Sequence, residues 1–152
     1  MQCKVDITSD SDIAAWVSKN MFMKYVDLMD ISLRESQKVF DWYHPLWFRQ
    51  SSSGELCFTP PAFTFSDGCL RGINGRHRAV LLCRHLDPIP MLLVNPHTWP
   101  KSIIKKIVQR EINANEVLEL PALALNEALI ENEDPDDTIT VSNFNIEINL
   151  CY

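Results

Sequence analysis

The chain has 152 residues, a length typical of one domain. Its apolar fraction of 46% and charged fraction of 22% are those of a globular protein and exclude an intrinsically disordered one. The formal net charge of −6 argues against a protein that coats nucleic acid, because such proteins are basic. We therefore expect a single globular domain over residues 1–152.

Cysteine usage and hydropathy indicate a cytoplasmic protein. The five cysteines are an odd number without a C-x-x-C pair, which favours reduced thiols. The first residues lack the apolar region of a signal peptide, and no apolar run approaches the ~20 residues that span a bilayer. The His and Cys spacings form no zinc ligand set. We expect no membrane association and no zinc.

The first 20 residues predict a strand and then a helix. Residues 3–7 alternate as a strand does. Within residues 8–20, polar capping residues precede Ile13, Trp16 and Val17, which are spaced as one face of a helix.

The next segment combines an ambiguous stretch with a second helix. Residues 21–31 are apolar and fit either a helix or a strand. Ser32 and Glu35 form a capping box, and Pro45 disfavours helical geometry in the residue before it. These signals predict a helix over residues 32–44.

The middle of the chain predicts a hairpin, a helix and a buried strand. After a loop at residues 49–55, two strands enclose an Asp-Gly pair, which is a strong hairpin signal. A helix over residues 76–86 follows, and then a nearly all-apolar strand. We expect the strands near 69–73 and 89–94 to lie side by side and parallel, with the helix crossing one face.

The last third predicts helices and a final β element. Residues 98–117 and 121–133 have helical patterns, each with proline in the first turn, and residues 137–152 alternate with period two. Strand, helix and strand flanked by helices indicate an α/β or α+β fold.

The start of the helix at residue 76 is the main functional signal. The Asn74-Gly75 turn is followed by Arg76, His77 and Arg78, although the positive end of a helix disfavours cations. Backbone amides at a helix start bind phosphate, and exposed arginines can add bidentate contacts. His77 can act as an acid or base near neutral pH. These five residues predict a phosphate or nucleotide site, with His77 as the catalytic candidate.

Residues 56–94 resemble the core of the ParB/sulfiredoxin superfamily. Gly75, His77 and Arg78 carry the resemblance, together with Ile89 and Pro90 of the following strand. The resemblance implies a small mixed-sheet fold that binds ATP or CTP, with Mg²⁺, at this helix start. The superfamily includes CTP-binding partition proteins, ATP-dependent sulfiredoxins, free-serine kinases and DNA-cleaving plasmid proteins, and residues 98–152 would form an extension to the shared core.

The sequence departs from two branches of that superfamily. Sulfiredoxins have a reactive cysteine directly after the glycine, where this chain has Arg76, so sulfiredoxin activity is not expected. Partition proteins usually have Glu followed by two Arg after the glycine, where this chain has Arg76, His77 and Arg78. A recognisable helix-turn-helix DNA-binding domain after the motif is also missing. Two interpretations stay open: an NTP hydrolase, phosphotransferase or nuclease of plasmid or phage type, or a non-catalytic module that engages a protein or DNA.

Two further groups of residues bear on these interpretations. Lys101, Lys105 and Lys106 form either a nucleic-acid contact or a solvated basic face. The sequence does not identify which acidic residue would bind Mg²⁺ or activate a nucleophile. The four candidates are Asp41, Glu55, Asp67 and Asp87.

Overall fold

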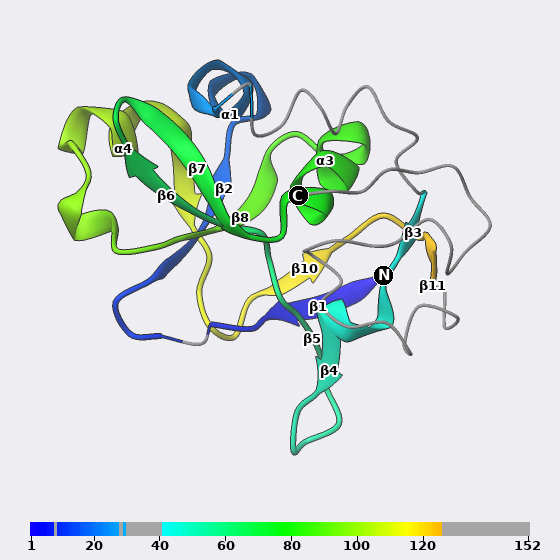
Figure 1. Cartoon of the computed structure of the whole chain (residues 1–152). Helices are drawn as coiled ribbons and strands as arrows, with labels where there is room; N and C mark the ends of the chain where they lie inside the picture. The colour runs from blue at the N-terminus through cyan, green and yellow to red at the C-terminus, as the bar shows by residue number, and fades with distance from the viewer. Residues whose placement is uncertain (8, 28, 30–40, 126–152) are drawn as a thin grey trace.

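A computed structural model describes residues 1–7, 9–27, 29 and 41–125. It combines helices with mixed sheets, so the predicted α+β class is confirmed (Figure 1). The helices are α1 (Lys19–Tyr25), α3 (Arg76–His85) and α4 (Lys101–Ile107), and the 3-10 turns are η1 (Pro45–Trp47) and η2 (Pro96–Thr98). No helix in these ranges is long and apolar enough to cross a membrane.

The largest sheet has five strands in the order β7-β6-β8-β2-β9. Its central pair β6 and β8 is parallel, and the other three pairs are antiparallel. Helix α3 connects β7 to β8. The bounds are β2 (Ile13–Val17), β6 (Ala62–Ser66), β7 (Cys69–Asn74), β8 (Ile89–Leu93) and β9 (Val108–Glu111).

A second sheet of four strands has the order β10-β1-β5-β4. Strand β1 lies in its middle, parallel to β5 and antiparallel to β10, so residues near the two ends of the described chain meet. A short parallel pair, β11 and β3, stands apart. The bounds are β1 (Gln2–Val5), β3 (Trp42–Tyr43), β4 (Phe48–Gln50), β5 (Leu56–Phe58), β10 (Val117–Glu119) and β11 (Ala124–Leu125).

The predicted hairpin, helix and buried strand in the middle of the chain are confirmed. Asp67 and Gly68 form the turn between β6 and β7, both with positive φ (52° and 77°). The pairing expected for β7 is wrong, however. Strand β6 lies between β7 and β8, and β7 runs antiparallel to β8, because the tight turn folds β7 back against one edge of β6 and leaves the other edge for β8.

The helix predicted over residues 8–20 is wrong. Residues Ile13–Val17 form β2, which pairs with β8 on one side and with β9 on the other. Ala14, Ala15 and Val17 are buried there. Pairing with two neighbours and burial override the helical spacing of a five-residue segment.

The helix predicted over residues 98–117 exists only as α4, Lys101–Ile107. The chain then becomes β9, because Val108–Glu111 completes the edge of the sheet beside β2. The predicted helix over 32–44 is wrong at its end, where Trp42–Tyr43 is a strand. The predicted helix over 121–133 is wrong at Ala124–Leu125, which is also a strand.

Some predictions fall outside the described residues. They are the body of the 32–44 helix, the part of the 121–133 helix after residue 125 and the β element at 137–152. The ambiguous stretch at 21–31 contains most of α1, which ends at Tyr25.

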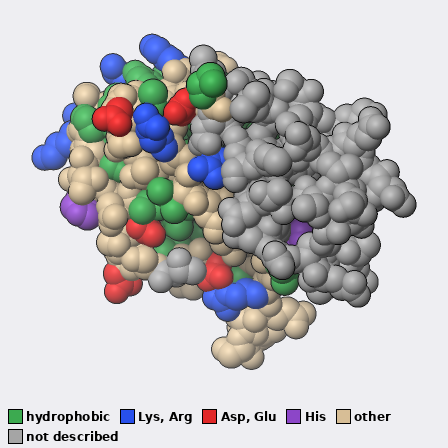
Figure 2. Space-filling model, viewed as in Figure 1, with side chains coloured by type: hydrophobic (Ala, Val, Ile, Leu, Met, Phe, Trp, Pro, Cys, Tyr) green, Lys and Arg blue, Asp and Glu red, His purple; other side chains and the backbone are tan. Residues whose placement is uncertain are grey.

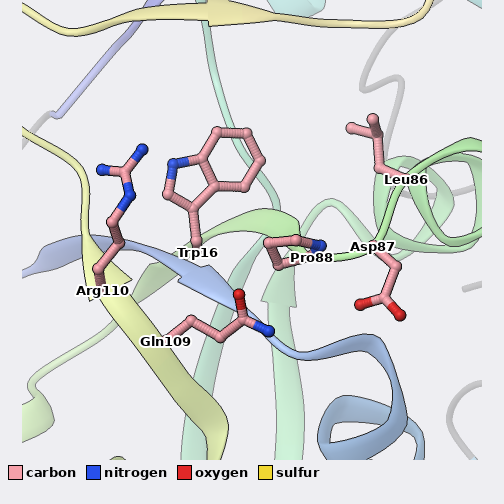
Figure 3. Close-up of a pocket in the computed structure, with 6 residues that line it drawn as sticks. All are labelled: Trp16, Leu86, Asp87, Pro88, Gln109 and Arg110. Carbon is pink, nitrogen blue, oxygen red and sulfur yellow. The ribbon is translucent and has the colours of Figure 1, made fainter.

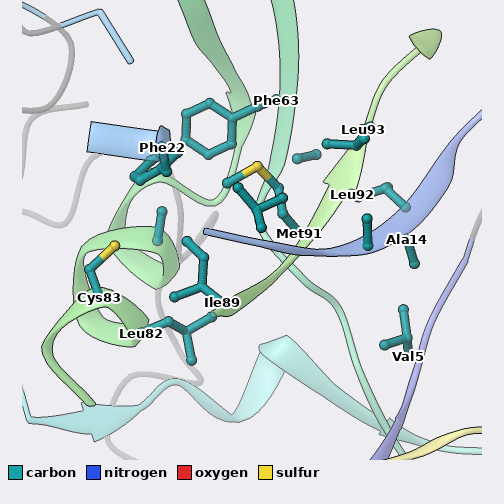
Figure 4. Packing of buried hydrophobic residues seen from close by; sticks show 14 of the residues in the cluster. Val5, Ala14, Phe22, Phe63, Leu82, Cys83, Ile89, Met91, Leu92 and Leu93 are labelled. Carbon is teal, nitrogen blue, oxygen red and sulfur yellow. The ribbon is translucent and has the colours of Figure 1, made fainter. Parts of the chain in front are cut away.

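One buried core joins α3, α1 and the large sheet, and it continues into β1, β5 and β10 of the second sheet (Figure 4). Phe22 of α1 meets Phe63 of β6 edge-on, with ring centroids 5.1 Å apart. Leu82 of α3 packs toward Ile89 and Met91 of β8. Every residue of β8 is buried, as a strand covered on both faces should be. This packing fixes α3 and therefore the position of its first turn.

Candidate functional site: the start of helix α3

Gly75 forms the turn from which α3 begins. Its φ of +88° lies in the left-handed region, which glycine adopts without steric cost. A Cβ at this position would lie 2.7 Å from Nε and Nη2 of Arg78 and 2.8 Å from Cα of Pro61. The space beside the Cα of Gly75 is therefore filled by the Arg78 guanidinium group.

Arg78 is buried, with 2% of its surface exposed, so its expected exposure is wrong. Its Nη1 donates to the carbonyl oxygen of Thr59 at 2.6 Å, and its Nη2 donates to Oδ1 of Asn74 at 3.1 Å. Its Cζ lies 5.8 Å from the centre of the Trp47 ring. Arg78 thus ties three segments together: the residues after β5, the end of β7 and the turn η1.

Arg76 turns back along β7. Its Nη2 donates to the carbonyl oxygen of Gly72 at 2.7 Å, and the side chain is half-buried. A Cβ on Gly72 would lie 2.7 Å from Cγ of Arg76. In this conformation the side chain of Arg76 occupies the space that a Cβ at position 72 would take, and its charge is held next to the strand.

A hollow of about 400 Å³ opens beside Arg76, and we call it the α3 hollow. Its lining residues are Asp27, Met29, Arg71, Gly72 and Arg76. Nη1 of Arg71 lies 3.4 Å from Oδ2 of Asp27, so one ion pair spans part of the lining. The α3 hollow thus brings together one guanidinium group from the strand, one from the helix and one carboxylate.

The structure places the other predicted site residues differently. Asn74 is exposed at the end of β7 and holds Arg78. His77 is buried, with 4% exposure, and does not line the α3 hollow. Of the five residues predicted to form the phosphate site, Arg76 alone lines the α3 hollow.

Asp27 and Arg71 were missed by the sequence-based prediction. Residue 27 reaches the site because Val26 bridges to Leu70 and the amide of Asp27 donates to the carbonyl oxygen of Leu70. No local pattern encodes that long-range contact. Arg71 had a signal, since it stands with Arg76, Arg78 and Arg84 in the arginine-rich part of the chain.

The four acidic candidates do not line the α3 hollow. Asp67 approaches it most directly, with Oδ2 3.7 Å from Nη2 of Arg71. The other three have partners elsewhere: Glu55 pairs with Lys4, Asp41 with His85, and Asp87 accepts a hydrogen bond from the amide of Lys19. Within the described ranges, no group of three His, Cys, Asp or Glu residues is placed to hold a metal ion.

The three predicted nucleic-acid contacts lie on α4. Lys101, Lys105 and Lys106 are all exposed. Figure 2 shows Lys and Arg side chains along the upper left of the molecule, where Figure 1 places α4. The α4 surface, defined by these three lysines, is separate from the α3 hollow.

Comparison with known proteins gives no match to a family model, a curated protein or a solved structure. The ParB/sulfiredoxin resemblance stays a prediction from residues 56–94.

Proposed function

We propose that this protein binds the phosphate group of a nucleotide, ATP or CTP, in the α3 hollow. One observation carries the proposal: Arg71 and Arg76 line the same hollow at the first turn of a ten-residue helix that has no acidic residue there. The positive end of a helix favours anions, and guanidinium groups match phosphate oxygens in a bidentate way. The free thiols of Cys3, Cys57, Cys69 and Cys83 are consistent with action in the cytoplasm.

In this proposal the residues of the motif have different tasks. Arg76 contacts the phosphate. Arg71 breaks its ion pair with Asp27 and then contacts the phosphate as well. Arg78 and Gly75 do not line the α3 hollow, and they stabilise the turn at the start of α3 without touching the ligand. Asp27 is the carboxylate of the hollow that a Mg²⁺ ion bound to the phosphates would meet, since Mg²⁺ needs only one or two carboxylates beside phosphate oxygens.

Calorimetric titration of the full chain with ATP, ADP, CTP and GTP, with and without Mg²⁺, tests the proposal. Arg76→Gln should weaken binding roughly tenfold or more, because a hydrogen bond to a charged group contributes about 1.5–3 kcal/mol. Arg84→Gln is the matched control, since it removes the same charge near the other end of α3, where Arg84 is exposed. Absence of binding by all four nucleotides, or equal affinity of Arg76→Gln and wild type, would contradict the proposal.

The burial of His77 favours a second candidate, a non-catalytic binding module on the same site. A product assay on each nucleotide that binds separates the two. If the protein is a phosphohydrolase or phosphotransferase with His77 as acid or base, His77→Gln should cut turnover by roughly 10²–10⁴ with little loss of affinity. A wild-type protein that binds nucleotide and releases no product identifies the module.

A further inference from the structure

A second hollow, of about 480 Å³, lies at the opposite end of α3 and shares no residue with the α3 hollow. We call it the Trp16 hollow. It is open to solvent and is bordered by β2, by β9 and by the segment that follows α3. Its lining residues are Trp16, Leu86, Asp87, Pro88, Gln109 and Arg110. In Figure 3 the indole of Trp16 stands between Arg110 on one side and the 86–88 segment on the other.

Glu116 fixes the aromatic wall of the Trp16 hollow. The indole Nε1 of Trp16 donates to Oε2 of Glu116 at 3.3 Å, and Nη1 of Arg110 donates to Oε1 at 2.6 Å. Cζ of Arg110 lies 5.8 Å from the centre of the Trp16 ring. The hydrogen bond from Arg110 lowers the pKa of Glu116, so this carboxylate stays charged near neutral pH. The indole is thereby held in place before any ligand arrives, and the charge of Arg110 is offset by Glu116.

Asp87 supplies a carboxylate on the opposite side. It is exposed, it accepts one hydrogen bond, from the amide of Lys19 at 3.1 Å, and it has no ion pair with any described residue. The side chain of Lys19 lines a different hollow, with Met23 and Arg84. Gln109 also lines the hollow, and its side-chain amide has no hydrogen bond to another described residue.

The formal charges around the Trp16 hollow favour a cation. Asp87 and Glu116 are two carboxylates, and Arg110 is one guanidinium group. Because Arg110 is already paired with Glu116, phosphate or another anion would meet the carboxylate of Asp87, which has no ion pair with a described residue. An uncharged apolar ligand would cover the exposed Asp87 without pairing its charge, which costs free energy.

We propose that the Trp16 hollow binds a guanidinium group carried on an aliphatic chain. A guanidinium is planar, so it can stack on the open face of the Trp16 indole while two of its N–H groups donate to the carboxylate of Asp87. The carbonyl of Gln109 accepts a further N–H. Leu86 and Pro88 provide an apolar wall for the methylene groups of the ligand.

The test titrates the full chain with butylguanidinium and follows the ¹⁵N–¹H signal of the Trp16 indole by NMR. Butylurea is the matched control ligand, because it has nearly the same shape and no charge. Butylguanidinium should shift the Trp16 signal with saturation, and butylurea should bind at least about threefold more weakly. Added salt should weaken the binding of butylguanidinium, since the Asp87 carboxylate is exposed.

Two variants locate the contact. Asp87→Asn keeps an acceptor for the Lys19 amide and removes the charge, and it should weaken binding about three- to fivefold. Trp16→Leu removes the ring and should weaken binding by about threefold. Because this variant lacks the indole signal, its affinity is measured from the shifts of the backbone amide signals of β9. Asp10→Asn is the control, because it removes another exposed carboxylate, which lies outside this hollow.

Equal binding of butylurea, unchanged affinity of Asp87→Asn, or a Trp16 signal that does not move would each overturn this inference. The comparison of the two ligands uses only wild-type protein, so the result does not depend on whether a variant folds. None of these outcomes bears on the α3 hollow, where phosphate binding is tested separately.

Discussion

Arg78 is a buried cation that organises the backbone around it. Its guanidinium group bonds the Thr59 carbonyl and Asn74, and it lies against Trp47. We expect Arg78→Met to lower the free energy of unfolding by about 2–4 kcal/mol, because it removes two hydrogen bonds that a buried guanidinium group donates. Urea unfolding measures this change. The exposed control Lys105→Met should stay within about 0.5 kcal/mol of wild type, and a similar value for Arg78→Met would show that Arg78 is dispensable.

Gly75 and Gly54 allow a matched comparison. Both have positive φ, +88° and +83°, but a Cβ on Gly54 meets nothing within 4 Å, whereas one on Gly75 meets Arg78 and Pro61. Gly54→Ala should cost only the backbone strain, about 1–2 kcal/mol. Gly75→Ala should cost clearly more, since the Cα of Pro61 has to shift as well. Equal unfolding midpoints of the two variants would mean that the contact with Arg78 is easily relaxed.

Asp27 competes with any anion for Arg71. The Arg71–Asp27 pair is partly exposed, at 44% and 24% of the two side chains, so its net contribution is small. Asp27→Asn should nevertheless tighten nucleotide binding in the absence of Mg²⁺ by about threefold, because Arg71 is released. Calorimetry compares it with Asp67→Asn, which removes a weaker partner of the same arginine. A loss of affinity in Asp27→Asn without Mg²⁺ would show that Asp27 helps rather than competes.

At the scale of the elements, local signals predicted the hairpin, α3 and β8. Asp67-Gly68 and Asn74-Gly75 determine their turns by backbone conformation, and β8 is recognisable by its unbroken apolar sequence. Strands β2 and β9 were missed because their pairing, Trp16 with Arg110, joins segments far apart in sequence. The same limit applies to the candidate site. The helix start was predictable, and the approach of Asp27 to β7 was not.

Helix α4 carries the predicted nucleic-acid contacts, and they can be tested as a unit. If Lys101, Lys105 and Lys106 bind phosphates of DNA, replacing all three by Gln should reduce the slope of log K against log salt by up to about 3. Fluorescence anisotropy with a DNA duplex at several salt concentrations gives the slope. Lys19→Gln with Lys24→Gln on α1 is the control. An unchanged slope in the triple variant would mean that these three lysines do not contact DNA phosphates.

At the scale of the whole molecule, β1 joins the two ends of the described chain. The amino group of Met1 donates to the carbonyl oxygen of Leu120 at 2.9 Å and lies 3.0 Å from Oε1 of Glu119. Cys3 lies on this strand, between β5 and β10, with 3% exposure. Its low exposure should therefore slow attack by a reagent until the four-stranded sheet opens.

Cys3 should report that opening. Burial raises the pKa of its thiol to about 11, so in the folded protein it stays protonated up to that pH, whereas in the unfolded chain it ionises near 9. The raised pKa means that this group's contribution to stability is present below pH 9 and is lost between about pH 9 and 11. At pH 8 a thiol reagent should modify half-buried Cys69 well before Cys3, as mass spectrometry of the peptides would show. Equal rates would mean that β1 detaches readily.

The close contact at the start of α3 also constrains how this sequence can vary. Gly75 and the Arg78 guanidinium occupy adjoining space, and a side chain at position 75 would collide with that group. A homologue that keeps arginine at position 78 should favour glycine at position 75, whereas one with a small residue at position 78 keeps only the constraints from Pro61 and from the positive φ. The two positions should therefore substitute together, and in a set of diverged sequences this covariation would be a structural signature, present whether or not the α3 hollow is used for binding.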